Sequence, residues 1–309
     1  MVISENPRTR RDPQAVRRRW AARAFAGAAL AAGLTAALCL LDYRRECAAL
    51  DAVVRDVAPL RLPDDVQALA LLHWVRNLDG TKRNTAYFAW PTCRATPWQV
   101  AQFGGDCADR ALLLKALLDR AGLPTTRVML FDPQTGAPVH TVVEARLPAE
   151  RRMVLDPVFG LSFPRPQPHR YYGLAELRAD PDVARRRVRA VQDCLPRTAS
   201  IQAYPWAHGD YRHASTFNWE KNALTRLAWR WGHAWLGEEV YSLPRPPVLE
   251  WPQLLLAYSA GGAGLLLLAA AVVARRTRPP RRTFRGWPLA TSDAPRRSRC
   301  GVIPEVEPN

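Results

Sequence analysis

Residues 104–124 read GGDCADRALLLKALLDRAGLP, and this stretch predicts a buried helix that begins at a cysteine. Asp106 is a residue type that commonly caps a helix N-terminus, so the helix is expected to start at Cys107. Leucines and alanines follow on a broad face, and Gly122 with Pro124 predicts where the helix ends. A helix this apolar is expected at the centre of a folded domain, with Cys107 in its first turn.

A cysteine in the first turn of a helix has the surroundings of a nucleophile. Cysteine attacks as the thiolate, and the N–H groups and dipole of a helix N-terminus favour that negative charge. We expect Gly104 and Gly105 to let the backbone approach a substrate closely. The amide of Cys107, with a side-chain donor from Gln102 or Gln99, could form an oxyanion hole. The alternative is a buried cysteine that acts only as a small hydrophobic residue.

The residues after this helix alternate between strand formers and turn formers. They predict strands at 126–131, 139–146 and 152–156. His140 is near the start of the second strand and Asp156 is at the end of the third, and these ends are neighbours in an antiparallel pair. We therefore expect Asp156 to accept a hydrogen bond from the His140 imidazole and to orient it toward Cys107. A structural histidine and an ordinary turn aspartate are the alternatives.

This combination resembles the transglutaminase-like superfamily of papain-like cysteine enzymes. The resemblance rests on Gly-Gly-Asp-Cys with its Leu-rich helix, on the strand with His140, and on the Val-Leu-Asp-Pro that contains Asp156. It covers about residues 64–165. It implies an α+β papain-like core, with a central helix packed on a small antiparallel sheet. It also implies Cys107 as nucleophile, His140 as base and Asp156 as the residue that orients the base.

The same family includes protein cross-linkers, peptidases, amidases and inactive members. The resemblance implies that Cys107 attacks a peptide or carboxamide carbonyl and forms a thioester, which water (hydrolysis) or an amine (transfer) then resolves. Peptidase or amidase activity is favoured over cross-linking. We predict no cofactor and no metal, since the absence of a C-x-x-C pair argues against structural zinc. The alternative function is a non-catalytic, membrane-anchored scaffold that binds an envelope peptide or a partner protein.

Two uncharged apolar segments, residues 24–41 and 254–274, flank this region. Each has the length of a membrane-spanning helix, the first at the short end of the range. A cleaved signal peptide is the alternative for the first segment, but no convincing small-residue cleavage site follows it directly. We therefore predict two transmembrane helices, one on each side of the folded domain.

The formal net charge of +16 lies mostly at the two ends of the chain. Residues 1–23 hold seven arginines and two acids, and residues 275–309 hold nine arginines and three acids. By the positive-inside rule both tails are cytoplasmic, and residues 43–250 form a periplasmic or otherwise exterior domain. The expected partners are the lipid bilayer and a peptide or protein substrate, with an envelope component as one candidate. A nucleic-acid partner is not expected, because it needs a basic face on the fold.

Further helices are predicted from Asp64 to about Asn77 and, rich in arginine, from Pro181 to Val191. The residues from Pro97 are expected to form a short helical or irregular segment. Residues 166–250 form an aromatic-rich extension in which Leu224, Leu227, Trp231 and Trp235 recur at helical spacing. Trp98 and Trp219 are candidates for lining the cleft, although a helix start with core tryptophans is favoured for the segment around Trp219. Three exterior cysteines remain after Cys107, and they allow three pairings of one disulfide: Cys47, Cys93 and Cys194.

Overall fold

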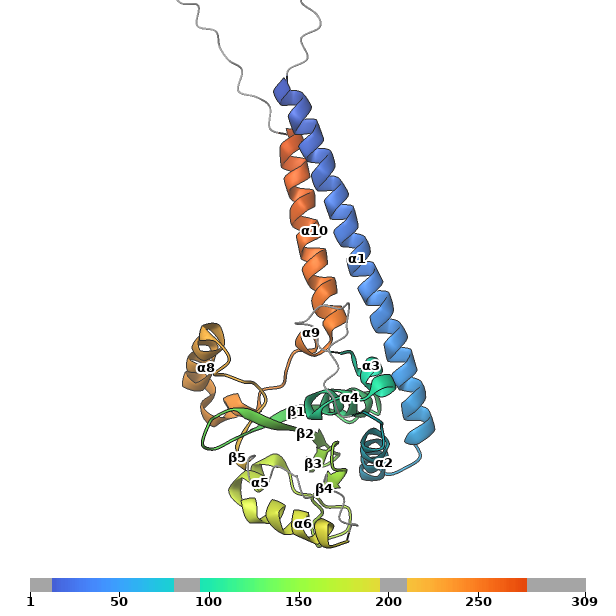
Figure 1. Cartoon of the computed structure of the whole chain (residues 1–309), viewed down its shortest axis with the longest axis vertical. Coiled ribbons are helices and arrows are strands. Elements are labelled where there is room, and N and C mark those ends of the chain that lie inside the picture. The colour runs from blue at the N-terminus through green and yellow to red at the C-terminus, as the bar shows by residue number, and fades with distance from the viewer. Residues whose placement is uncertain (1–12, 81–94, 195–209, 277–309) are drawn as a thin grey trace, which may run out of the picture.

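The computed structural model describes residues 13–80, 95–194 and 210–276. Two long helices, α1 (Pro13–Val57) and α10 (Pro252–Arg276), run side by side away from an α+β domain (Figure 1). The two apolar segments identified in the sequence lie inside these helices. Both helices are long and apolar enough to cross a membrane, and α1 lies near the N-terminus. The basic tails, which we predict to be cytoplasmic, fall mainly outside the described residues.

Helices α1 and α10 pack in one antiparallel register. Gly264 of α10 lies so close to α1 that a Cβ there would come within 3.3 Å of the Ala29 carbonyl oxygen. At the other end of the contact, the rings of Tyr43 and Trp251 meet edge to face, with centroids 4.9 Å apart. This register sets the uncharged stretch 24–41 beside the apolar part of α10. Most leucines on the outer sides of the pair are exposed, as a lipid-facing surface requires.

Helix α1 continues past the predicted span and becomes part of the domain. Its last turns place Leu50 and Val54 in the main hydrophobic core, and Trp251, just before α10, and Leu254, in its first turn, belong to the same core. The N-terminal and C-terminal helices therefore complete the interior of the domain that they flank.

Two predicted helices are present at their expected places, and the short segment from Pro97 is also helical. These helices are α2 (Asp64–Arg76), α3 (Pro97–Phe103) and α4 (Cys107–Arg120). Helix α4 is the most buried, and its apolar face packs against α1, α2 and the sheet. Gly122 follows the helix with a φ of 81°, in the left-handed region that glycine reaches without steric penalty. The prediction of a central apolar helix that begins at Cys107 is confirmed.

The sheet has five antiparallel strands in the order β4-β3-β2-β1-β5. The predicted strands correspond to β1 (Thr125–Phe131), β2 (Pro138–Arg146) and β3 (Arg152–Asp156). Two strands were not predicted, β4 (Leu161–Ser162) and β5 (Asp210–Ser215). Strand β5 adds to β1 on the side opposite β2, so β1 lies in the interior of the sheet.

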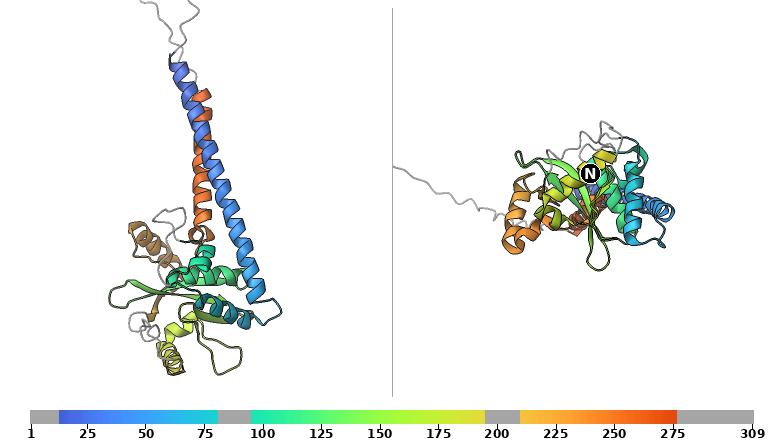
Figure 2. Two further views of the ribbon diagram at one scale, coloured as in Figure 1. Left: turned by 45° about the vertical axis from the view of Figure 1, so that its right-hand side comes forward. Right: turned by 90° about the horizontal axis from the view of Figure 1, so that it is seen from below.

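The sheet separates two cores. The first contains α4, α2 and the domain ends of α1 and α10, whereas the second lies under α5 (Leu174–Ala179) and α6 (Pro181–Cys194). The left view in Figure 2 shows helices on both sides of the sheet. Helix α6 is the predicted Arg-rich helix, and Asp180 accepts from the N–H of Asp182 over 3.0 Å at its start.

The aromatic-rich extension ends in α8 (Ala223–Leu236), the 3-10 helix η3 (Gly237–Ser242) and α9 (Pro247–Glu250). The segment around Trp219 precedes α8 as expected, and Trp219 is partly buried. Within α8, the side chains of Trp231 and Trp235 are 65% and 82% exposed. Cys47 is a free thiol, so the structure does not form either disulfide that would use it. The remaining pairing, of Cys93 with Cys194, involves Cys93, which lies outside the described residues.

Candidate functional site

The start of α4 holds the cysteine in a tightly capped turn. The Oδ1 atom of Asp106 accepts from the N–H groups of Ala108 (2.9 Å) and Asp109 (3.0 Å), and the Asp109 carboxylate accepts in return from the N–H of Asp106. This capping box satisfies two of the N–H groups that a helix N-terminus leaves without intrahelical partners. The N–H of Cys107 is outside the cap, and the Cys107 thiol is free and partly exposed.

The histidine and the aspartate of the predicted triad are in direct contact. Nε2 of His140 lies 2.8 Å from Oδ2 of Asp156, and both side chains are buried. The other carboxylate oxygen of Asp156 accepts from the N–H groups of Val158 (3.0 Å) and Phe159 (3.2 Å). These two bonds fix the carboxylate, so it holds the imidazole ring in one orientation.

His140 also forms a side-chain hydrogen bond with Cys107. Because Nε2 faces Asp156, Nδ1 is the ring nitrogen left for the sulfur. The structure thus brings together the three residues that the sequence separates by up to 49 positions. The order of contact is sulfur, imidazole, carboxylate, and only the sulfur end is partly open to solvent.

The surroundings of His140 favour its charged form. Burial disfavours the imidazolium, but the carboxylate of Asp156 and the side chain of Cys107 outweigh it, and together they raise the pKa of His140 from 6.5 to about 10. The ring of Phe159, with its centroid 5.8 Å from that of His140, packs on the pair. At neutral pH the imidazolium is therefore the favoured form beside Cys107, which is the charge state that stabilises a thiolate.

Gly104 and Gly105 are needed for packing within the chain, and the expected close approach of a substrate to this backbone stays a prediction. Gly104 has a φ of 72°, and a Cβ there would lie 1.9 Å from the carbonyl oxygen of Asp79. A Cβ on Gly105 would lie 2.5 Å from the Cβ of Asp109. Gly104 lets the chain before Cys107 pass directly against the segment that follows α2, and Gly105 leaves room for the Asp109 side chain that caps α4.

Arg110 holds the same region from inside, a role that the sequence analysis did not assign. Its guanidinium is nearly fully buried and donates only to backbone carbonyls. Five oxygens accept from it, those of Val75, Arg76, Leu78, Gly80 and Gly105, at 2.6 to 3.2 Å. The side chain thereby joins the C-terminal end of α2 to the loop that precedes Cys107. The signal for this role in the sequence was an arginine near the start of a helix with a broad apolar face. Its acceptors are backbone atoms, which composition does not reveal.

The other predicted site residues have different surroundings. Gln99 belongs to the capping box of α3, where its Oε1 accepts from the N–H of Thr96 over 3.0 Å. Gln102 is exposed on α3. Of the two glutamines, it is the one whose side chain takes no part in the helix cap. Trp98 is partly buried against the main core. The ring of Trp219 is tilted by 36° to that of Phe217, with centroids 4.9 Å apart. Trp219 also lines a pocket of about 370 Å³, whose lining contains none of the three triad residues.

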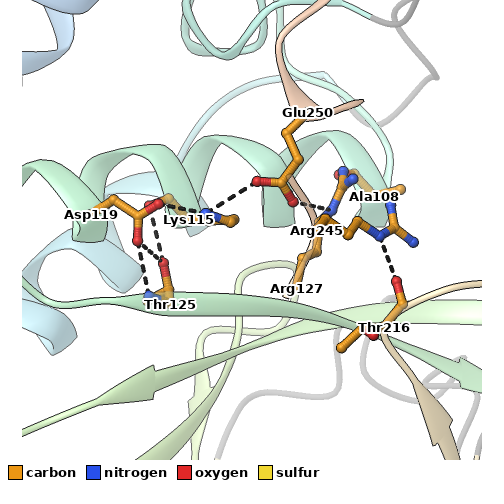
Figure 3. Close-up of polar contacts among 8 residues, drawn as sticks. All are labelled: Ala108, Lys115, Asp119, Thr125, Arg127, Thr216, Arg245 and Glu250. Atoms are coloured by element: carbon orange, nitrogen blue, oxygen red, sulfur yellow. Dashed lines mark hydrogen bonds and ion pairs between the residues drawn. The ribbon is translucent and has the colours of Figure 1, made fainter. Parts of the chain in front are cut away.

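A buried ionic network links α4 to Glu250, which ends the short helix just before α10 (Figure 3). Oε2 of Glu250, in α9, lies 3.1 Å from Nζ of Lys115, and its other oxygen lies 3.8 Å from Nε of Arg127 in β1. Lys115 also contacts Asp119, and Arg127 donates to the carbonyl of Ala108 over 3.4 Å. Despite burial, Glu250 and Asp119 raise the pKa of Lys115. The network reaches from the base of α10 to the residue after Cys107.

In comparisons with known proteins, no family model, no curated sequence and no solved structure matches the chain.

Proposed function

We propose that this protein is a membrane-anchored, transglutaminase-like cysteine enzyme that acts on peptide or carboxamide bonds. The observation that carries the proposal is the buried His140, which bonds to the Asp156 carboxylate on one side and to the Cys107 side chain on the other. A nucleophile, a base and a residue that orients the base are the parts that acyl transfer through a thioester requires. The central α4 and the antiparallel sheet beside it are consistent with the papain-like core that the sequence resemblance implies.

The proposed reaction begins when the Cys107 thiolate attacks the carbonyl carbon and a C–S bond forms. The carbonyl oxygen becomes an oxyanion, which the N–H of Cys107 and the side chain of Gln102 would stabilise. His140 then donates its proton to the nitrogen, the C–N bond breaks, and an amine leaves. The products of this half-reaction are a thioester on Cys107 and a neutral imidazole.

In the second half-reaction, neutral His140 takes a proton from water or from an acceptor amine as that molecule attacks the thioester. The C–S bond breaks and an acid or a new amide is released. The thiolate and the imidazolium are restored, with no net change in the enzyme. Asp156 keeps the ring in place and stabilises its positive charge throughout.

We further propose that α1 and α10 both span the membrane, with both tails cytoplasmic and the enzymatic domain in the periplasm or an equivalent exterior space. Two observations support this. The shared register of the helices aligns their uncharged segments. Arginines come just before the apolar part of α1 and just after that of α10, so they gather at the same end of the helix pair. Reporter fusions after residue 290 should then read cytoplasmic, and fusions near residue 175 should read exterior. The opposite pattern would reject this orientation.

The proposed chemistry can be tested on the full chain in detergent with a chloroacetamide probe. We expect wild-type protein to be labelled at Cys107 at neutral pH, and Cys107→Ser to lose that labelling. Cys47→Ser removes another free thiol and is the matched control, which should be labelled at Cys107 as strongly as the wild type. Trapping the acyl-enzyme and identifying its acyl group by mass spectrometry would then define the substrate.

The non-catalytic scaffold makes the opposite predictions. If Cys107 labels only as an ordinary thiol does, and if the Cys107→Ser protein restores function fully in cells that lack the wild type, the enzyme proposal is wrong. Slow labelling of Cys107 together with full complementation would therefore favour a binding role for the same fold.

A further inference from the structure

Helix α8 packs along one side on η3, the 3-10 helix that follows it, and η3 is bonded to the domain where the Tyr241 carbonyl accepts from the N–H of Thr216 over 2.9 Å. Trp229 donates from Nε1 to the hydroxyl of Tyr241 over 3.2 Å, and its ring stacks on His233 with centroids 5.1 Å apart. Gly232 lies against Val240, where a Cβ would come within 3.0 Å of a valine methyl. These contacts fix the rotation of the helix about its axis, and so determine which side faces outward.

The outward side of α8 is a continuous apolar surface. Its four large side chains recur at spacings of three and four residues and are 77%, 51%, 65% and 82% exposed: Leu224, Leu227, Trp231 and Trp235. Large apolar side chains gathered on one face mark an interaction site, because burying them removes apolar area from water. Arg226 and Arg230 are exposed on the neighbouring side of the helix. A helix with an apolar face that contains tryptophan and with arginines beside it has the composition of an interfacial membrane helix.

The position of α8 fits this composition. Tyr43 and Trp251 pair where the uncharged parts of α1 and α10 end, and such aromatic residues concentrate at the boundary between membrane and water. In both side views α8 lies at the height of α9 and of the first turns of α10 (Figures 1 and 2). The spanning helices would therefore bring the bilayer surface to the level of α8.

We infer that α8 binds the surface of the lipid bilayer, with its apolar face in the boundary between headgroups and acyl chains. The inference rests on the membrane anchoring proposed above. Tryptophan and leucine enter the boundary, and Arg226 and Arg230 attract anionic headgroups. The contact gives the domain a third attachment to the membrane. Because α8 follows β5, and β5 pairs with β1 beside the strand of His140, this attachment sets how the site faces the bilayer.

The test uses the full chain in vesicles of phosphatidylcholine and phosphatidylglycerol, with acyl chains brominated either near the headgroup or near the bilayer centre. Bromine quenches tryptophan that it contacts. The difference in emission between wild type and the Trp231→Phe/Trp235→Phe variant is the component that comes from these two tryptophans. We expect bromine near the headgroup to reduce this component about twofold, and bromine at the centre to reduce it less. Trp74→Phe, in the partly buried α2, is the matched control, and the component it removes should not be quenched.

If the component from Trp231 and Trp235 is not quenched at either depth, the inference is wrong. If, in addition, Leu227→Glu shifts the protein from a larger to a smaller species in size-exclusion chromatography, a second copy of the chain covers the face instead of lipid. A wash with alkaline carbonate tests separately whether α1 and α10 span the membrane, because it removes proteins that bind only to the surface. Wild-type protein that is washed off the vesicles would reject the spanning helices, whereas retained protein without quenching would reject only the role of α8.

Discussion

Nε2 of His140 lies 2.8 Å from Oδ2 of Asp156, and 5% or less of either side chain is exposed. With Cys107 on the other side of the ring, this contact raises the pKa of His140 to about 10. The folded pKa is higher than the ordinary value of 6.5, so the folded state binds the proton more tightly than the unfolded state does. The stabilisation is complete below pH 6.5, decreases as the pH rises, and is lost above about pH 10.

Removing His140 should therefore affect stability in a pH-dependent way. We expect the free energy of unfolding of His140→Gln to differ most from that of wild type below pH 6.5, and the difference to shrink as the pH approaches 10. Chemical denaturation of the detergent-solubilised chain across this range measures it. A difference that is constant over the whole range would show that the proton on His140 does not contribute.

Asp156→Asn should leave the ring in place but remove the charge that holds its proton. We expect the pKa of His140 to fall below about 10, which NMR of ring-labelled histidine can follow. The rate of acyl transfer should fall ~10²-fold or more, because the imidazolium is no longer stabilised. Asp119→Asn is the control. It removes a carboxylate that bonds Thr125 rather than His140, and it should leave the titration of His140 unchanged.

Arg110 supports the loop before Cys107, and its loss should destabilise the fold. Arg110→Met leaves five backbone carbonyls without their donor, so we expect a loss of ~3 kcal/mol or more in the free energy of unfolding. Arg120→Met is the control on the same helix, since it breaks only a partly exposed ion pair with Asp51 and should cost ~1 kcal/mol or less. Equal losses in the two variants would contradict the assigned role of Arg110.

Glu250 should matter for stability because it is a buried charge with buried partners. Glu250→Gln removes the buried one of the two carboxylates that Lys115 contacts, and we expect a loss of ~3 kcal/mol in unfolding free energy. Lys115→Met/Glu250→Gln removes both charges of the pair, so its loss should be smaller than the sum of the losses in Lys115→Met and Glu250→Gln. Additive losses would show that the two charges do not interact in the folded protein.

Gly104→Ala should be far more harmful than the same change at another glycine of similar backbone conformation. At Gly104 the new Cβ would collide with the Asp79 carbonyl, whereas at Gly122, which has a φ of 81°, nothing lies within 4 Å of it. Gly122→Ala should therefore cost only the conformational penalty of ~1–2 kcal/mol. Thermal melting of both variants gives the comparison, and a similar shift in each would exclude the steric role of Gly104.

The sequence predicted those elements whose causes are local. The cap at Asp106, the apolar face after it and the stop at Gly122 are all encoded within one short stretch, so α4 was predicted with its correct first residue. The contact of His140 with Asp156 followed from antiparallel pairing alone. Both predictions needed only the order of elements along the chain.

Features that depend on distant parts of the chain were not predicted. Strand β5 is short, mixes polar and apolar residues, and pairs with a strand about 80 residues earlier. The acceptors of Arg110 are backbone oxygens of another helix and its following loop. The exposure of Trp231 and Trp235 was also missed, because helical spacing predicts an apolar face without saying what covers it.

The interior of the domain draws side chains from Leu50 and Val54 near one end of the chain and from Trp251 and Leu254 near the other. During synthesis, Cys107, His140 and Asp156 all leave the ribosome before the last residues of this core do. The core beneath α4 is therefore complete only after the start of α10 has been made. A chain that stops short of Trp251 would have to fold without two of the side chains that fill its interior.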